Sequence, residues 1–297
     1  MGSNKKMRRA LPASEIDLGP YILRFDKPRV MGILNCTPDS FSGDGLGDNA
    51  VLAKRRGRSM FAQGADIVDV GGESTRPGAL PVRAEDEIRR VVPVIEALSG
   101  HRPGRISVDT MKAKVAEAAL QAGAAIVNDV SGLRSSALIR VIAEHDAAAI
   151  IMHMKGTPRT MQNKPRYKDV VEDVMRFLEE RIASAESGGV SPRKIMVDPG
   201  IGFGKTLVHN LELIGRLSEF RALGKPVVIG VSRKSFIGKL TGNPADDRLE
   251  GSLAAAVLAV KEGASMVRVH DVGETVRALR VSSAIHSRSR RLPNKVF

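Results

Sequence analysis

The chain has 297 residues, of which 42% are hydrophobic and 27% are charged, as in ordinary globular proteins. No apolar run approaches the roughly 20 residues that span a bilayer, and the basic N-terminus lacks the apolar segment of a secretory signal, so we expect no membrane partner. The single cysteine excludes an internal disulfide bond, and we expect a cytoplasmic protein.

The formal net charge of +13 raises the hypothesis of a nucleic-acid partner. Much of the excess comes from eight basic residues near the two ends, namely Lys5, Lys6, Arg8, Arg9, Arg288, Arg290, Arg291 and Lys295. Aromatic residues are only 3% of the chain, too few for the stacking platforms of single-strand binders. We therefore expect flexible basic tails over residues 1–15 and 287–297, one catalytic domain over 16–286, and no nucleic-acid partner.

Short apolar runs alternate with helical segments along the chain, after a Gly19-Pro20 turn that predicts an N-terminal hairpin over Ile16–Phe25, closing the bottom of a barrel. The predicted strands are Val30–Leu34, Ile67–Val70, Ile106–Val108, Ile126–Val127, Ala149–Met152, Ile195–Val197, Val227–Ile229 and Met266–Val269. The clearest predicted helices are Lys112–Ala122, Asp169–Ser187, Leu211–Ala222 and Leu249–Glu262. Eight such units in about 250 residues predict a single (β/α)8 TIM barrel. The alternative, a doubly wound sheet, usually has about five or six strands.

A polar or ionisable residue follows every predicted strand. In chain order these residues are Asn35, Asp69, Asp109, Asn128 with Asp129, His153, Asp198, Ser232 and His270. Active sites of this barrel lie at the carboxyl ends of the strands, so the set predicts a site for a small polar ligand, with loop polarity as the alternative. We expect Asp109 and Asp198 to face inward, where carboxylates can accept the N–H groups of a flat, guanidine-like heterocycle. Asp129 fits a helix cap equally well.

Two glycine-rich loops predict a close approach of the backbone to an anion. The first, GGESTRPG over residues 71–78, carries Arg76 and two hydroxyl groups. The second, DPGIGFGKT over residues 198–206, resembles a P-loop only in part, because that pattern requires glycine where Pro199 stands. Tight turns are the alternative explanation for these glycines.

Basic groups follow the last two predicted strands, where barrels of this kind commonly bind phosphate. Arg233 and Lys234 follow the seventh strand, and Arg268 and His270 end the eighth on one side of it. Together with Arg76 they favour a site for a di-anion. Taken singly, Arg233 fits a surface ion pair and His270 fits a core histidine.

The first predicted strand is followed by Asn35 and Cys36, not by the His-x-His of many metallohydrolase barrels. The hard oxygen of Asn35 suits Mg²⁺ that is shared with substrate phosphates. Cys36 has no adjacent base in the sequence, so we expect a small neutral side chain that fills space rather than a nucleophile.

Eight strings between Val30 and Val272 together resemble the bacterial dihydropteroate synthases over nearly the whole chain. They are MGILNCTPDSFS, DIVDVGGESTRPGA, ISVDT, AGAAIVNDVSGL, MHMKGTP, DPGIGFGK, GVSRKSFIG and VRVHDV. The resemblance implies a transferase of folate biosynthesis that joins dihydropterin-methyl pyrophosphate to p-aminobenzoate and releases pyrophosphate. It also implies Mg²⁺ as cofactor, a homodimer formed through barrel helices, and a target of sulfonamides.

The resemblance assigns roles to individual residues. For the pterin they are Asp109, Asn128, Met152, Asp198, Lys234 and Arg268. For pyrophosphate they are Asn35, Thr75, Arg268 and His270, with Asn35 also on the metal. For p-aminobenzoate they are Thr75, Arg76, Pro77, Phe203, Lys234 and Ser235. The implied catalytic residues are Asp39, Asp109, Asp198 and Lys234, and Asp39 would act when the first loop closes.

Two other functions stay open. A pterin-binding methyltransferase barrel that serves a corrinoid partner would share the carboxylates but would not need the Arg76 loop, Phe203 or the Lys234-Ser235 pair. A non-catalytic RNA-binding or scaffold protein would use the basic tails, and its binding would weaken steeply with salt.

Overall fold

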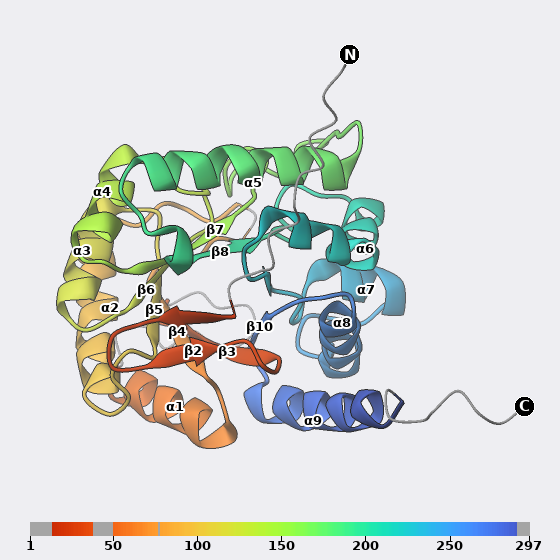
Figure 1. The fold of residues 1–297 in the computed structure, drawn as a ribbon, viewed down its shortest axis with the longest axis horizontal. Helices are drawn as coiled ribbons and strands as arrows, with labels where there is room; N and C mark the ends of the chain where they lie inside the picture. Colours follow the sequence, from red (N-terminus) through yellow and green to blue (C-terminus); the bar gives the residue numbers. More distant parts are fainter. Residues whose placement is uncertain (1–13, 38–49, 77, 290–297) are drawn as a thin grey trace, which may run out of the picture.

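The computed structural model describes residues 14–37, 50–76 and 78–289. Eight parallel strands form a barrel with helices around it (Figure 1). The barrel strands are β3 (Arg29–Asn35), β4 (Ile67–Gly71), β5 (Ile106–Asp109), β6 (Ile126–Asp129), β7 (Ala148–Met152), β8 (Ile195–Asp198), β9 (Val228–Ile229) and β10 (Met266–Val269). The predicted site residues Asp39 and Pro77 lie outside the described residues, as does most of the two predicted tails.

The strand order around the sheet is β8-β7-β6-β5-β4-β3-β10-β9, and every neighbouring pair is parallel. A parallel bridge between Val197 and Val227 joins the two edges, so the sheet closes on itself. All eight predicted strands are present, which confirms the (β/α)8 barrel and excludes the open, doubly wound alternative. The register places Asp109 beside Asn128 and Met152 beside Asp198, so the polar strand ends lie at one rim.

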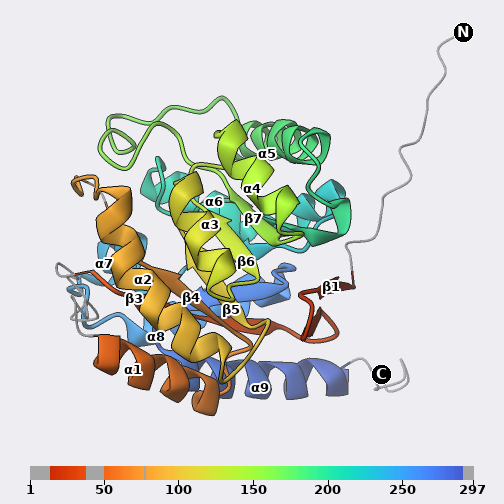
Figure 2. The ribbon, with the colours of Figure 1, turned by 90° about the vertical axis from the view of Figure 1, so that its left-hand side faces the viewer.

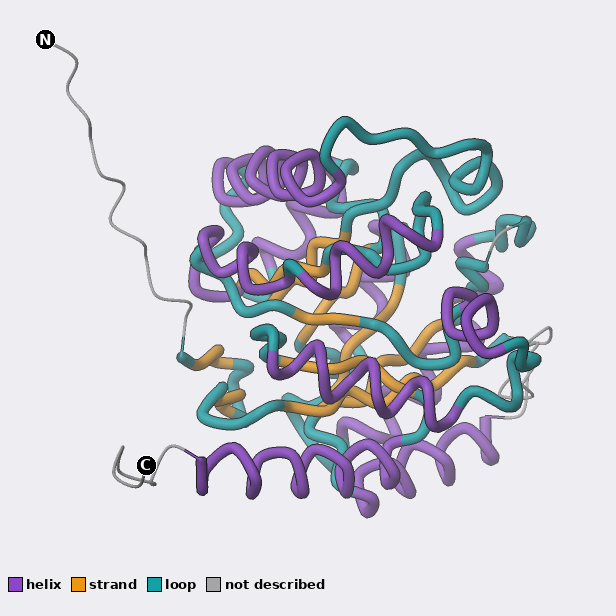
Figure 3. Tube along the Cα trace, turned by 90° about the vertical axis from the view of Figure 1, so that its right-hand side faces the viewer, coloured by secondary structure: helices purple, strands orange, loops and turns teal. Residues whose placement is uncertain are grey.

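Helices surround the strands (Figure 1), and from the side they lie above and below them (Figure 3). They are α1 (Ala50–Gln63), α2 (Ala84–Ser99), α3 (Ala113–Gln121), α4 (Ser136–Glu144), α5 (Val170–Ser187), α6 (Leu207–Gly215), α7 (Ser235–Thr241), α8 (Leu249–Lys261) and α9 (Val272–Ser289), with short 3₁₀ turns η1 (Pro192–Lys194) and η2 (Leu217–Leu223). Each helix buries one apolar stripe against the strands. In α4, for example, Leu138, Ile139 and Ile142 are buried, and Ser135 caps the first turn by accepting from the Leu138 N–H.

The N-terminal hairpin is present and closes the bottom of the barrel, as predicted. Strand β1 (Glu15–Asp17) pairs antiparallel with β2 (Ile22–Arg24). Its apolar residues Ile16 and Leu23 are buried in one cluster with Met31, Ile67 and other residues of the barrel interior. Figure 2 shows β1 at the end of the molecule opposite the long loop that follows β7. The other end of the barrel is therefore the open one, called the mouth below.

One predicted helix is wrong. Leu211–Ala222 is not a single helix, because α6 ends at Gly215 and the 3₁₀ turn η2 follows Arg216. Helix α6 begins earlier than expected, since Thr206 and His209 form a reciprocal capping box at its N-terminus. Glycine costs about 1 kcal/mol relative to alanine inside a helix, and Gly215 stands where the predicted helix breaks.

The described helices include none with the length and apolar character needed to cross a membrane. Helix α9 ends at Ser289, so the domain boundary expected after residue 286 falls inside its last turn.

Candidate active site

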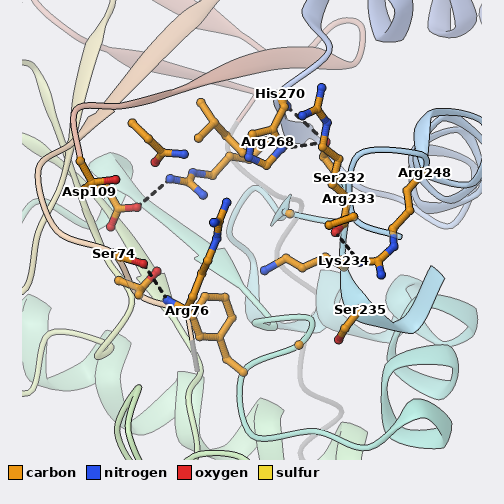
Figure 4. A pocket seen from close by; sticks show the side chains of 18 of the residues that line it. Ser74, Arg76, Asp109, Ser232, Arg233, Lys234, Ser235, Arg248, Arg268 and His270 are labelled. Carbon is orange, nitrogen blue, oxygen red and sulfur yellow. Dashed lines mark hydrogen bonds and ion pairs between the residues drawn. The ribbon is translucent and has the colours of Figure 1, made fainter. Parts of the chain in front are cut away.

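A cavity of about 380 Å³ lies at the mouth, between the loops that follow the strands. Among the predicted site residues, those that line it are Asn35, Thr75, Arg76, Asp109, Phe203, Lys234, Ser235, Arg268 and His270. Figure 4 shows Arg76, Lys234 and Arg268 reaching into this space from three different segments. The strand ends and the glycine-rich loops thus meet at one site, as the sequence predicted.

Arg268 lies between two carboxylates at the inner end of the cavity. Its Nε is 2.6 Å from Asp69 Oδ2, and its Nη2 is 2.6 Å from Asp109 Oδ2. Asp69 is fully buried and also accepts from Asn128 Nδ2 at 2.9 Å, while its Oδ1 has no hydrogen-bond partner in the described part of the chain. One guanidinium therefore pairs with two buried acids, and unused acceptor capacity remains beside them.

Burial shifts the pKa values of three groups that the sequence assigns to the site. It raises the pKa of Asp109 to about 7, against the opposing effect of Arg268 and with the help of Asp69. Burial also raises the pKa of Asp198, although the Gly200 N–H donates to that carboxylate. The pKa of Lys234 is lowered to about 8, first by burial and then by the charge of Arg268. Such shifts concentrate at functional sites because function requires charges in partly dry surroundings.

The basic side of the cavity is built by the loops after β9 and β10. Ser232 Oγ lies 3.1 Å from His270 Nδ1 and accepts from the His270 backbone N–H. Arg233 has a positive φ of 55° and makes a two-pronged ion pair with Asp271. The ion pair of Arg233 is partly buried rather than on the surface, and Arg233 lines the cavity together with His270, which is therefore not a core histidine.

The outer part of the cavity combines an apolar wall with cationic groups. Lys234 Nζ lies 4.3 Å from the centre of the Phe203 ring, within the range of a cation–π contact. Ser235 is the first residue of α7 and lies exposed at the rim. Arg76 is on the loop after β4. This part suits a flat ring that carries a carboxylate.

The loop after β4 is held by a buried ion network. Lys112 Nζ lies 2.6 Å from Glu73 Oε2 and 2.6 Å from Glu87 Oε2, and Glu87 is fully buried on α2. Glu73 also accepts from the Val82 N–H with its other oxygen. The segment that carries Thr75 and Arg76 is thereby tied to the barrel wall at its base.

Other strand-end residues lie outside the cavity lining. Asn128, Met152 and Asp198 are buried at neighbouring strand ends of the same rim, Asn128 opposite Asp109 and Met152 opposite Asp198 in the register. Met152 clusters with apolar residues that include the partly buried Phe203. Asp129 accepts from the backbone N–H groups of Ser131 and Leu133, so it holds the loop after β6. The helix-cap interpretation of this residue is wrong, because Ser135 is the N-cap of α4.

Sequence reasoning missed several contributors to the site, of which Asp69, Gln162 and Arg248 are examples. Asp69 was noted at a strand end but received no role, although a carboxylate inside the apolar run IVDVG is itself a signal of a buried polar partner. Gln162 and Arg248 also line the cavity. They come from long irregular segments, where no periodicity indicates which side chains face inward.

No group of three His, Cys, Asp or Glu side chains suited to a metal occurs in residues 14–37, 50–76 and 78–289. Asn35 lines the cavity and offers one amide oxygen. Cys36 is buried, and burial raises the pKa of its thiol to about 12, which supports the space-filling interpretation over a nucleophile.

Comparisons with known proteins agree with this geometry. Residues 31–270 match a family model described as pterin binding enzyme. The chain is 47% identical over 262 residues to the dihydropteroate synthase of Escherichia coli K12, covering 88% of this chain and 93% of that protein. The Yersinia pestis dihydropteroate synthase in a sulfonamide drug complex superposes with a TM-score of 0.89 at 41% identity, over 92% of this chain and 99% of that one. The Xanthomonas albilineans enzyme in complex with 7,8-dihydropteroate gives a TM-score of 0.82 at 42% identity, over 94% and 100%.

Proposed function

The chain belongs to the dihydropteroate synthase family of pterin-binding enzymes, and we propose that the mouth of its barrel joins dihydropterin-methyl pyrophosphate to p-aminobenzoate, giving dihydropteroate and pyrophosphate. The observation that carries this proposal is one cavity with buried acids at its inner end and cationic groups at its outer end. The acids suit a pterin, and the cations suit the two anionic groups of the substrates.

The pterin binds against the inner carboxylates. Asp198 and Asn128 hydrogen-bond its amino-pyrimidine edge, because a carboxylate can accept two parallel N–H groups. Asp109 accepts a further ring N–H, since its contact with Arg268 uses only one of the two carboxylate oxygens. The guanidinium of Arg268, held at Nε by Asp69, stacks on the pterin face, a geometry that favours arginine.

The pyrophosphate lies against Arg268, His270 and Thr75. Asn35 would hold a Mg²⁺ ion through its one hard amide oxygen, and the described residues place no cluster of carboxylates there. When bound, this ion supplies neutralisation of charge on the leaving group.

The reaction exchanges one bond at the pterin methylene carbon for another. The C–O bond to pyrophosphate breaks first and its electron pair leaves with the pyrophosphate, so positive charge develops on the pterin. The fixed carboxylates of Asp109 and Asp198 stabilise that charge, a contribution that is commonly the largest in enzyme catalysis. The amine nitrogen of p-aminobenzoate then forms the C–N bond and loses one proton. No covalent bond to the protein forms.

The second substrate binds in the outer part of the cavity. Its ring packs on Phe203, and its carboxylate faces Lys234, Ser235 and the Arg76 loop. A methyltransferase barrel that transfers a one-carbon unit to a corrinoid would not need this outer site. The arrangement of these side chains around one cavity therefore favours the condensation over the methyltransferase alternative.

We place this reaction in the cytoplasm, where a lone buried thiol such as Cys36 stays reduced. We also propose a homodimer through α8 and α9, which pack against each other (Figure 1). Three large apolar side chains are exposed on these helices, Leu258 at 53%, Val281 at 62% and Ile285 at 67%. A second copy of the chain would cover them, and sedimentation analysis measures whether it does.

Calorimetry with the pterin pyrophosphate tests the assignment of the inner pocket. In Asp198→Asn an amide N–H faces a pterin donor, and such a mismatch costs roughly 1–3 kcal/mol, or about tenfold to a hundredfold in Kd. The matched control is Asp146→Asn, which alters an exposed carboxylate paired with Lys194 at the other end of the barrel and leaves the Kd unchanged. An Asp198→Asn protein with the affinity of the wild type contradicts the proposed pterin pocket.

A further inference from the structure

The loop after β8 carries Phe203 but has the composition of a flexible segment. Gly200, Gly202 and Gly204 alternate along it, and all three have positive φ values of 70°, 84° and 67°. Glycine in these conformations loses much conformational entropy when it is ordered. A ring that forms the wall of a binding site must nevertheless be held in one place, so the anchors of this loop matter.

Hydrogen bonds from three surrounding segments hold the glycines. Each is 2.7 Å long: Gly200 N–H to Asp198 Oδ1, Gly202 N–H to Asn210 Oδ1, Gln162 Nε2 to the Gly202 carbonyl and Tyr167 Oη to the Gly204 carbonyl. The loop also packs directly on the end of β7, since a Cβ at Gly200 would lie 1.9 Å from the His153 carbonyl oxygen. These anchors fix the residues on either side of Phe203.

Phe203 itself is held by the side-chain amine of Lys205. Lys205 is only 3% exposed, and its Nζ lies 3.0 Å from the Phe203 carbonyl oxygen. The same Nζ lies 2.8 Å from His153 Nδ1 and 3.5 Å from the His153 carbonyl oxygen. Burial lowers the pKa of this amine well below its ordinary value, and three polar atoms, one of them on Phe203, surround it and hold it in place.

His153 is suited to accept this bond. Burial, followed by the charge of Lys205, lowers the pKa of its imidazole to about 2, so the ring is neutral. The ring packs edge-on against Phe177 at 4.9 Å between centroids, which keeps Nδ1 directed at Lys205. Lys205 Nζ therefore joins the end of β7 to the backbone of Phe203.

A buried lysine is costly to desolvate, and an apolar side chain would fill the same volume without that cost. What the lysine adds is a directed link between a rigid strand and one carbonyl of a glycine-rich loop. The Phe203 ring lies 4.3 Å from Lys234 Nζ and lines the cavity. A shift of the Phe203 backbone would move the ring away from Lys234 and from the cavity.

We propose that Lys205 is a positioning residue that sets the Phe203 ring against the aryl ring of the second substrate. This inference rests on the proposed function, because it takes p-aminobenzoate as the ligand of the outer cavity. Lys205 does not touch either substrate in this account. It acts through the Phe203 backbone.

Steady-state kinetics of Lys205→Met test the inference. We expect the KM for p-aminobenzoate to rise roughly tenfold, the KM for the pterin pyrophosphate to stay within about twofold, and kcat to fall less than the ratio kcat/KM for p-aminobenzoate. The matched control is Lys114→Met, the same replacement at an exposed lysine on α3, away from the loop after β8. It should leave both KM values unchanged.

A double-mutant cycle with Phe203→Ala separates positioning from a general structural role. If Lys205 acts through the Phe203 ring, Lys205→Met adds little to the KM for p-aminobenzoate once the ring is gone. If the two factors multiply, or if both KM values rise together, Lys205 does not position Phe203. Should Lys205→Met fail to fold, Lys205→Gln enters the same cycle with the same two outcomes, since one amide cannot reach all three acceptors.

The wild-type protein in the same assay distinguishes a failure of the proposed function from a failure of the proposed role of Lys205. If it forms no dihydropteroate, the proposed function is wrong. If it forms dihydropteroate and Lys205→Met leaves the KM for p-aminobenzoate unchanged, only the role of Lys205 is wrong.

Discussion

Replacing Arg268 by methionine should destabilise the protein in a way that depends on pH. The guanidinium is the group that pairs with both Asp69 and Asp109, at 2.6 Å each. Asp69 is fully buried, and one of its oxygens already lacks a partner among the described residues. Methionine fills a similar volume but leaves two adjacent buried carboxylates without a counter-charge.

The expected loss of unfolding free energy is about 3–5 kcal/mol at about pH 8, the usual cost of removing one partner from a buried ion pair. The loss should be smaller at about pH 5. Burial already raises the pKa of Asp109 to about 7, and loss of the cation raises it further. A carboxyl group with a higher pKa in the folded chain than in the unfolded chain, where it is about 3.9, binds more protons when folded. Its contribution to stability is therefore present at low pH and lost as pH rises.

Urea denaturation followed by circular dichroism at both pH values measures this loss. Arg277→Met is the matched control, because it breaks an ion pair with Glu274 that is mostly exposed, at 68% and 39%, and such surface pairs contribute about 1 kcal/mol or less. If Arg268→Met loses no more unfolding free energy than the control, or loses more at the lower pH, then Arg268 does not offset the charge of the two buried carboxylates.

Two further predictions follow from the site. The ratio kcat/KM for the pterin pyrophosphate should fall as the pH drops below about 7, since protonated Asp109 has lost the negative charge that stabilises the cation developing on the pterin. Asp109→Asn should abolish this acidic limb along with most of the activity. Binding should also be ordered, because Thr75 and Arg76 lie on a loop while the pterin residues lie at strand ends. Calorimetry should detect little p-aminobenzoate binding to the protein alone and clear binding once the pterin and Mg²⁺-pyrophosphate are present. Equal affinity in both states would show that the second site is preformed.

The barrel could be predicted because its signals are local and repeated. Each apolar run reports a strand that is buried on both faces, and the polar residue after it reports the rim. Asp109 and Arg268 could be placed at one site by that logic alone, since the carboxyl ends of parallel strands meet. The hairpin could be placed because Gly19 supplies the positive φ of its turn.

What could not be predicted depends on contacts between distant residues. The ion pair of Arg268 with Asp69 spans 199 positions, and no periodicity in the sequence indicates it. The break between α6 and η2 depends on a local balance between a strong cap at Thr206 and a weak position at Gly215, which the apolar pattern of Leu211–Ala222 hides. Lys205 looked like part of an anion-binding loop, yet its side chain faces the barrel wall.

The stoichiometry of the complete reaction tests whether this chain condenses the pterin pyrophosphate with p-aminobenzoate. Purified protein is incubated with dihydropterin-methyl pyrophosphate, p-aminobenzoate and Mg²⁺, and dihydropteroate and pyrophosphate are quantified in parallel by chromatography. We expect dihydropteroate and pyrophosphate to form in equal amounts, and we expect Asp198→Asn to form much less of each. Consumption of the pterin pyrophosphate without dihydropteroate, or no consumption at all by the wild-type protein, would contradict it.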